Sequence, residues 1–209
     1  MSVVKGMSTY REEQRQSQEL VIRYLRKAPE TERAQLKSMC SDYRNFRATI
    51  RDFQCRHLQA ICTLSCFQSN LSACCSKDGI ITFFADLVVN ALFSPPQALN
   101  NLMQSLHSAR DDMKCIYLGA NGCRWHVKPL VCEMFLCDRA LEGMKAADPQ
   151  AMTVWQRLVN EAQGFRWPDR PVLFDLIETR FLAAGLCSSL MYLHNSPGLM
   201  RIKRKAGLA

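Results

Sequence analysis

The segment KCIYLGANGCRWHVKPLVCEMFLC, residues 114–137, decides how this chain folds. It holds four of the eleven cysteines at short intervals separated by turn-forming residues, namely Cys115, Cys123, Cys132 and Cys137. A second group comes earlier in the chain and consists of Cys62, Cys66, Cys74 and Cys75. Residues 76–114 separate the two groups and contain no cysteine. We predict two clusters of thiols joined by a helical spacer.

The length of the chain allows it to fold without covalent cross-links. With 209 residues it suits one domain of ordinary size with helical additions. The first thirty residues show no secretory signal. The apolar stretch 80–93 is interrupted by Asp86 and Asn90 and is too short to span a bilayer. We therefore expect a soluble cytoplasmic protein without a membrane partner, in which clustered cysteines serve as metal ligands or catalytic thiols more often than as disulfides.

The net charge of +8 is distributed unevenly. Residues 1–57 carry twelve basic and seven acidic side chains, whereas residues 58–140 carry six of each. Thiolates around metal ions would make this middle region negative, and the basic helices could offset that charge. The basic excess then reflects internal compensation. The basic run 201–205 could grip phosphates, but we do not expect nucleic acid to be the partner.

Hydrophobic periodicity predicts a mainly α protein. We expect a helix at 9–27 that is capped by Thr9 with Glu12 in a capping box. A single amphipathic helix is predicted at 30–55, and a helix buried on all sides at 80–93. The remaining predicted helices cover the stretch from Ser94-Pro95 to about Arg110, then 149–163 and 169–193.

A short β-hairpin is predicted within the second cysteine group. Residues 115–118 are β-prone, 119–122 form a turn and 123–126 return as a second strand, which brings Cys115 and Cys123 together. Pro129 then begins a helix. The expected architecture is a helical domain around a small cysteine-rich metal-binding centre with this hairpin. It comprises an N-terminal helical extension (1–57), a cysteine-rich metal-binding domain (58–140) and C-terminal helices packed on the same core (141–209).

The clustered cysteines are the candidate metal ligands. Structural zinc takes four thiolate or imidazole ligands, and turns bring two ligands close while their backbone amides bond the sulfurs. Iron–sulfur clusters are also held by four thiolates, so the spacing leaves zinc, mononuclear iron and a [4Fe-4S] cluster open. His57 and His126 are alternative ligands. Three further cysteines fall on apolar helical faces and are interpreted as core residues: Cys40, Cys55 and Cys187.

The order of these residues resembles the YkgJ-like zinc- or iron-chelating domain family over roughly residues 60–140. The shared features are a cysteine-rich opening that ends in Cys74-Cys75, a helical insert, Cys115, Gly122-Cys123 and the segment KPLVCEMF at 128–135. The family has arginine where this chain has Lys128 and Glu133. The resemblance implies metal chelation by Cys62, Cys66, Cys74, Cys75, Cys115, Cys123, Cys132 and Cys137.

Three functions are compatible with these features. The first is a metal-binding protein whose zinc or iron fixes the fold and presents a surface to a protein partner. The second is an iron–sulfur enzyme that modifies a protein side chain, since one branch of the family is linked to lysine methylation; this chain has no glycine-rich methyl-donor loop. The third is a zinc-stabilised regulatory or nucleic-acid-binding protein. Whether the chain is an enzyme stays open.

Overall fold

A computed structural model of the chain describes residues 4–76, 81–107, 113–166 and 172–191. Most of these residues are helical, and the strands among them form one two-stranded antiparallel hairpin, so the predicted mainly α class with a short hairpin is confirmed. The elements are α1 (Val4–Lys27), α2 (Glu30–Met39), α3 (Ser41–His57), the π-helix η1 (Gln59–Phe67), α4 (Phe84–Phe93), α5 (Pro96–His107), β1 (Leu118–Gly119), β2 (Gly122–Cys123), α6 (Leu130–Met134), α7 (Asp138–Ala147), α8 (Pro149–Arg166) and α9 (Leu173–Ala183). Within the described ranges, no helix combines the length and the apolar character that a membrane span needs.

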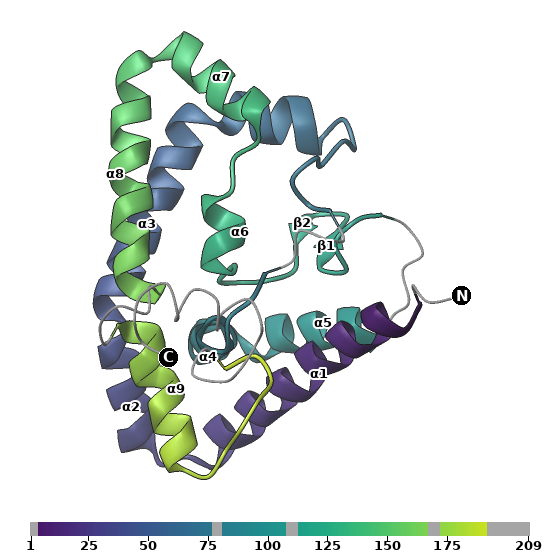
Figure 1. Cartoon of the computed structure of the whole chain (residues 1–209), viewed down its shortest axis with the longest axis vertical. Coiled ribbons are helices and arrows are strands. Elements are labelled where there is room, and N and C mark those ends of the chain that lie inside the picture. The colour runs from purple at the N-terminus through teal and green to yellow at the C-terminus, as the bar shows by residue number, and fades with distance from the viewer. Residues whose placement is uncertain (1–3, 77–80, 108–112, 167–171, 192–209) are drawn as a thin grey trace.

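The helices form a frame around α6 and the hairpin. Figure 1 shows α3 beside α8, α7 next to η1, and α1 beside α5, with α6 and the two strands lying between these pairs. Helix α4 contacts α1, α2 and α9. Its side chains from Phe84 to Asn90 are all buried, as the apolar sequence of this stretch predicts. The frame therefore rests on one central helix.

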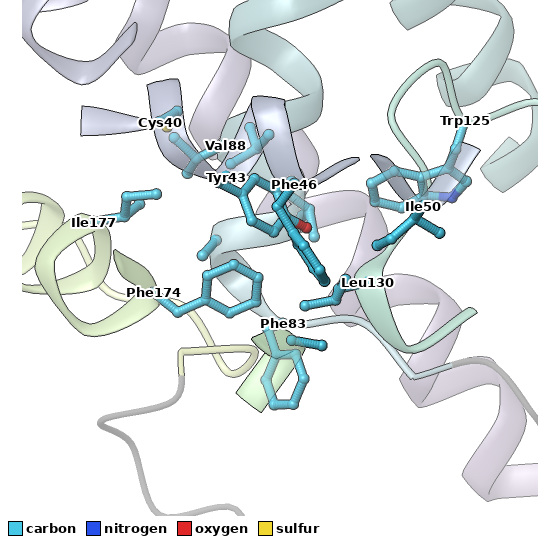
Figure 2. Packing of buried hydrophobic residues seen from close by; sticks show 14 of the residues in the cluster. Cys40, Tyr43, Phe46, Ile50, Phe83, Val88, Trp125, Leu130, Phe174 and Ile177 are labelled. Carbon is cyan, nitrogen blue, oxygen red and sulfur yellow. The ribbon is translucent and has the colours of Figure 1, made fainter. Parts of the chain in front are cut away.

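Aromatic rings join the long helices in the core. The Tyr43 ring on α3 lies 5.1 Å from the Phe165 ring and 5.8 Å from the Phe174 ring. Phe83, before α4, lies 5.8 Å from Phe174 on α9. Figure 2 shows Tyr43, Phe83 and Phe174 converging on Leu130 of α6. Each such ring pair stabilises the fold by about 0.5–1.5 kcal/mol beyond the contribution of the apolar area that it buries. Helix α6 therefore packs on a group of aromatic side chains.

The predicted helix at 30–55 is wrong, because the structure contains two helices there. The break falls at Cys40, which ends α2 and precedes α3 and whose N–H bonds to the carbonyl of Lys37, three residues back. Cys40 is fully buried. The bend lets α2 contact α4 while α3 contacts α8. One periodicity spans both helices because each keeps its apolar residues on the inner side, so the sequence pattern does not reveal the break.

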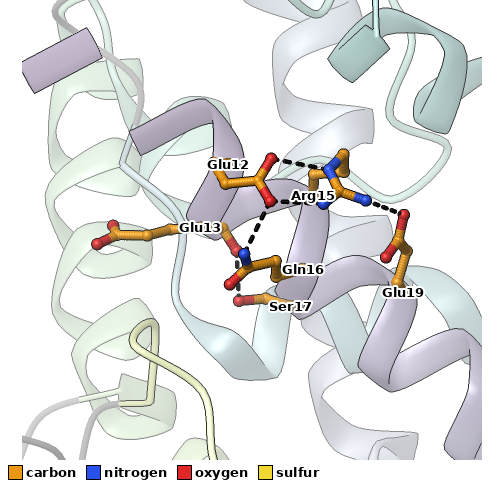
Figure 3. A network of polar contacts seen from close by, with 6 residues as sticks. All are labelled: Glu12, Glu13, Arg15, Gln16, Ser17 and Glu19. Atoms are coloured by element: carbon orange, nitrogen blue, oxygen red, sulfur yellow. Dashed lines mark hydrogen bonds and ion pairs between the residues drawn. The ribbon is translucent and has the colours of Figure 1, made fainter. Parts of the chain in front are cut away.

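The predicted start of the first helix at Thr9 is also wrong. Helix α1 begins at Val4, so Glu12 lies inside the helix and has no first-turn amide to cap. Figure 3 shows that Glu12 instead pairs with Arg15, which also bonds Glu19, each at 2.5 Å. Exposed pairs at this helical spacing contribute about 0.3–0.5 kcal/mol each. The network supports α1 locally and does not define its end.

Helix α9 ends at Ala183, ten residues before the predicted end at 193. Gly185 adopts a φ of +74°, a conformation that other residues rarely take. The N–H of Gly185 bonds to the Leu182 carbonyl and that of Leu186 to the Phe181 carbonyl, which is the Schellman termination of a helix. Residues 169–171 of the predicted helix, like the turn at 77–79 and the basic run at 201–205, lie outside the described residues.

A buried carboxylate on α4 fixes two chain segments at once. Asp86 is 2% exposed. Its two oxygens accept the N–H of Phe83 at 3.0 Å and that of Leu130 at 3.1 Å. Asp86 thereby caps α4 and holds the first residue of α6. Burial raises the pKa of Asp86 to about 6, although both amide hydrogen bonds oppose this shift.

We predict that the ionisation of Asp86 lowers stability as the pH rises. The carboxyl pKa is about 6 in the folded protein against 3.8 for an unperturbed group, so the stabilising protonated form is fully present below about pH 4 and is lost through pH 6. In urea titrations from about pH 4 to pH 7, the unfolding free energy of the wild type relative to Asp86→Asn should fall by up to about 3 kcal/mol. Asp52→Asn, at an exposed site on α3, should follow the wild type. A pH-independent difference between the wild type and Asp86→Asn would contradict this assignment.

Candidate functional site

One cavity receives cysteines from both groups. It has a volume of about 1040 Å³ and lies among α3, η1, the hairpin, α6 and α7. Cys62 and Cys137, which are far apart in the sequence, thus line the same cavity. Seven of the eight candidate ligands line it: Cys62, Cys66, Cys74, Cys75, Cys123, Cys132 and Cys137. The eighth, Cys115, does not line the cavity.

Backbone pairing places Cys115 beside the first group. The N–H of Cys115 donates to the carbonyl of Cys75 at 2.9 Å. Ser76 and Lys114 form an antiparallel bridge next to this bond. The Lys114 ammonium also donates to the carbonyl of Leu71 at 2.5 Å. The strand-like pairing of these short segments joins two parts of the chain that the sequence separates by the helical spacer.

The hairpin is shorter than predicted. Leu118 pairs with Cys123 and Gly119 with Gly122, which leaves Ala120 and Asn121 as the turn. Gly122 has a φ of +100°, where any side chain would be strained. Cys115 lies before the first strand, outside the paired residues. The turn nevertheless brings it near Cys123, as the predicted hairpin does. Charge repulsion from Cys123 contributes to the raised pKa of Cys115, because two thiolates repel.

An aromatic and polar contact fixes the hairpin on α1. The Tyr117 ring packs edge-on against Trp125 with 5.4 Å between centroids. The Tyr117 hydroxyl donates to the Gln14 side-chain oxygen at 3.0 Å. Gln14 is 1% exposed and its amide nitrogen donates to the hydroxyl of Thr82. The hairpin is therefore anchored through buried groups, which keeps Cys123 at a constant position.

Backbone amides point at several of the sulfur atoms. Cys115 accepts the N–H of Tyr117 and of Leu118, and Cys123 accepts that of Trp125. The N–H of Ala73 donates to the Cys66 sulfur at 3.4 Å. Burial raises the pKa of Cys115 to about 11 and also raises the pKa of Cys123, while the amides oppose both shifts. Amide donors favour the thiolate, which is the form that binds metals.

The vicinal pair divides its protons unequally. The Cys74 thiol donates to the Cys75 sulfur, which lowers the pKa of Cys75 and raises that of Cys74. The Lys128 ammonium also lowers the pKa of both thiols. It acts in the same direction on Cys62 and Cys123. Lys128 therefore supplies positive charge to the thiols, a role that the sequence pattern does not reveal.

The electrostatic couplings link the thiols across the cavity, and Cys74 is coupled both to Cys75 and to Cys132. We group the thiols into two sets by their other couplings. Cys75 is influenced by Cys115 and Cys123, and Cys115 by Cys123 and Cys132. These four thiols form the hairpin set. Cys62 is influenced by Cys74, Cys137 and Cys66, which together form the π-helix set. Each set contains four sulfur atoms, the number that a tetrahedral zinc site or a [4Fe-4S] cluster takes.

Cys62 and Cys66 lie on η1, a nine-residue π-helix. Such helices are rare and occur most often at functional sites. Helix α7 approaches η1 closely at Gly143, where an added Cβ would come within 2.5 Å of the Ile61 side chain. After η1 the chain turns back through Asn70 and Ser72, both with positive φ. This reversal of the chain brings Cys74 and Cys75 to the cavity. The periodicity of the sequence does not predict the reversal.

The segment that carries Cys132 is held from two sides. On α4, the Asn90 side-chain oxygen accepts the N–H of Val127 at 2.8 Å. On α3, Arg47 donates to the Lys128 carbonyl at 2.7 Å and forms an ion pair with Glu133. Both members of that pair are 10% exposed. Removal of one member of such a pair leaves a buried charge without a partner, so the pair locks α6 against α3.

Three cysteines outside the two groups have different environments. Cys40 is fully buried, which confirms its interpretation as a core residue. The same interpretation is wrong for Cys55, which is exposed and lines the cavity. It is also wrong for Cys187, which is exposed and follows the end of α9. The two failures have different causes, because Cys55 lies on a face of α3 that stays exposed, whereas Cys187 lies beyond the end of α9, which is shorter than predicted.

The two candidate histidines also differ. His126 lines the cavity. His57 lies against the Phe53 ring at 4.6 Å between centroids, and its Nδ1 is 3.7 Å from a carboxylate oxygen of Asp148. Among the described residues, no group of three or more His, Cys, Asp or Glu side chains is already arranged to hold a metal ion. The eight cysteines consequently stay predicted ligands.

Comparison of the chain with protein-family models, curated proteins and solved structures finds no match. The resemblance of residues 60–140 to the YkgJ-like domains therefore stays a prediction.

We predict that Asn90→Ala destabilises the cavity wall. Asn90 is 1% exposed and bonds both the Val127 N–H and the Ser94 hydroxyl. Leaving a buried N–H unsatisfied costs about 1–3 kcal/mol, and we expect a loss of this size in urea denaturation. Asn101→Ala is the matched control, because Asn101 is exposed on α5 and its side-chain oxygen accepts a hydrogen bond from Gln97 on the same helix. Equal losses in both variants would contradict the role of Asn90.

Proposed function

We propose that this protein binds zinc or iron through the clustered cysteines of residues 62–75 and 115–137. One observation carries the proposal: cysteines from residues 62–75 and 123–137 meet at one cavity, and backbone amides point at the sulfurs of Cys66, Cys115 and Cys123. Burial as small apolar side chains does not account for this arrangement, because it needs no amide donors to sulfur. Thiols that converge from two segments suit a metal ion, whose positive charge favours their thiolate form.

The hairpin set is the first ligand set that we propose. Cys75, Cys115, Cys123 and Cys132 come from three segments that are fixed by backbone hydrogen bonds, by the hairpin and by α6. Binding would draw these sulfurs inward by rotation of their side chains. The π-helix set would form a second site, made of Cys62, Cys66, Cys74 and Cys137. Lys128 would offset part of the negative charge that four thiolates place on one ion.

The proposal also accounts for the basic character of the chain. Residues 1–57 hold the basic excess, and α3 from this region borders the cavity. All eleven cysteines are free, as expected of thiols in a reducing cytoplasm, where we propose that the protein acts. The metal ion would fix the relative positions of η1, the hairpin and α6, and would thereby stabilise the fold.

Elemental analysis and an anaerobic absorption spectrum test the proposal. The full chain is purified without oxygen from cells supplied with zinc and iron. A brown protein that absorbs broadly near ~400 nm would identify an iron–sulfur cluster. A colourless protein with stoichiometric zinc would identify a zinc protein. Protein that is folded and contains neither metal would refute metal binding.

We predict that Cys75→Ser and Cys132→Ser each lower both the metal content and the melting temperature. Loss of a ligand is also loss of folding energy at such a site, so we expect most of the metal of the hairpin set to be lost. Cys187→Ser is the matched control, since Cys187 is exposed and lies outside the cavity. Metal content that is equal in all three variants would reject the ligand assignment. Measurement of metal per chain and of thermal unfolding on the same samples separates metal loss from misfolding.

A further inference from the structure

The cavity carries a row of arginines in addition to its thiols. Arg44, Arg47 and Arg51 recur at three- and four-residue intervals on α3, so they share one face of the helix. All three line the cavity, and Arg139 joins them from α7. Like charges that are gathered on one concave surface repel each other unless an anion lies between them. Anionic groups bound next to these arginines would therefore reduce the repulsion between them.

The described residues supply few such partners. Arg47 is neutralised by Glu133. Within the described part of the chain, the guanidinium groups of Arg44, Arg51 and Arg139 donate no hydrogen bond and form no ion pair. Arg44 does lie over the Phe93 ring, 4.5 Å from its centroid. Lys128 is assigned to the thiols, so these three arginines remain available for a ligand.

Large apolar side chains accompany the arginines. Phe67, Phe93 and Phe135 line the cavity together with Leu71. Phe135 is 56% exposed and Leu71 is 48% exposed. Exposed apolar side chains next to a concave surface mark an interaction site. A ligand that fits this surface has both apolar groups and negative charges.

The extent of the cavity selects the class of ligand. Along α3 the lining residues run from Tyr43 to Cys55. At 1.5 Å per residue this distance is about 18 Å, which matches an extended peptide of about five residues at 3.3 Å each. A single phosphate would contact only one part of such a row. A peptide can place carboxylates and apolar side chains along its whole length.

We propose that the cavity binds an acidic peptide segment of a partner protein. Its carboxylates pair with Arg44, Arg51 and Arg139, and its apolar side chains pack on Phe93 and Phe135. Bidentate pairing between guanidinium and carboxylate groups gives this contact its geometry. The proposal goes beyond metal binding and stands without it, because its arginines are not metal ligands.

Fluorescence anisotropy of a labelled nine-residue peptide of alternating Glu and Leu tests this proposal on the full chain. We expect saturable binding that weakens with salt, and at least about tenfold weaker binding for Arg51→Glu and for Arg139→Glu. Arg56→Glu on α3 is the matched control, since Arg56 is exposed and does not line the cavity. It should bind as the wild type does, and metal content should be unchanged in all three variants.

Several results would overturn the proposal. Absence of binding up to about 1 mM peptide would show that the surface does not bind such a segment. Equal weakening by Arg56→Glu would reveal attraction to the overall positive charge. Tighter binding of a single-stranded oligonucleotide than of the peptide would assign the arginines to nucleic acid.

Peptide binding that persists in Cys132→Ser after its metal is lost would support the peptide site and separate it from the metal proposal.

Discussion

Two buried polar side chains of α4 hold the segment on which the cavity depends. Asp86 accepts the N–H of Leu130, and Asn90, one turn later, accepts the N–H of Val127. Both side chains are at most 2% exposed, and such bonds are strong where water is excluded. The segment between Val127 and Leu130 therefore has one position relative to the core. This position of the segment also places Cys132 and Glu133 on α6, where Glu133 forms its ion pair with Arg47.

The helices and the loops of this protein have different tasks. The frame is made of helices whose apolar faces meet in one core, and it contains aromatic pairs between α3, α8 and α9. The cysteines of the hairpin set lie on short segments that cross the interior of the frame (Figure 1). Three of these cysteines lie outside the helices, whereas Cys132 lies on the short helix α6. A rigid frame then fixes where these segments meet.

Opposite charges meet at the cavity. Its thiols would become negative on binding the proposed metal ion, and its walls carry Lys128 and the arginines of α3 and α7. Lys128 acts on the thiols, whereas Arg47 is occupied by Glu133. The other arginines are left to face solvent and a ligand. Metal binding and peptide binding can thus occupy neighbouring parts of one surface through different residues.

The sequence by itself determined the mainly α class, the buried character of α4 and the hairpin between Cys115 and Cys123, because periodicity and turn residues act over a few positions. It also grouped seven of the cysteines that line the cavity. Only the tertiary structure decided the break at Cys40, the π-helix, and the placement of Cys55 and Lys128 at the cavity. These features depend on contacts such as that between Asp86 and Leu130, 44 residues apart. Local patterns indicate which face of an element is buried, but the partner that covers this face is selected by the packing of the whole chain.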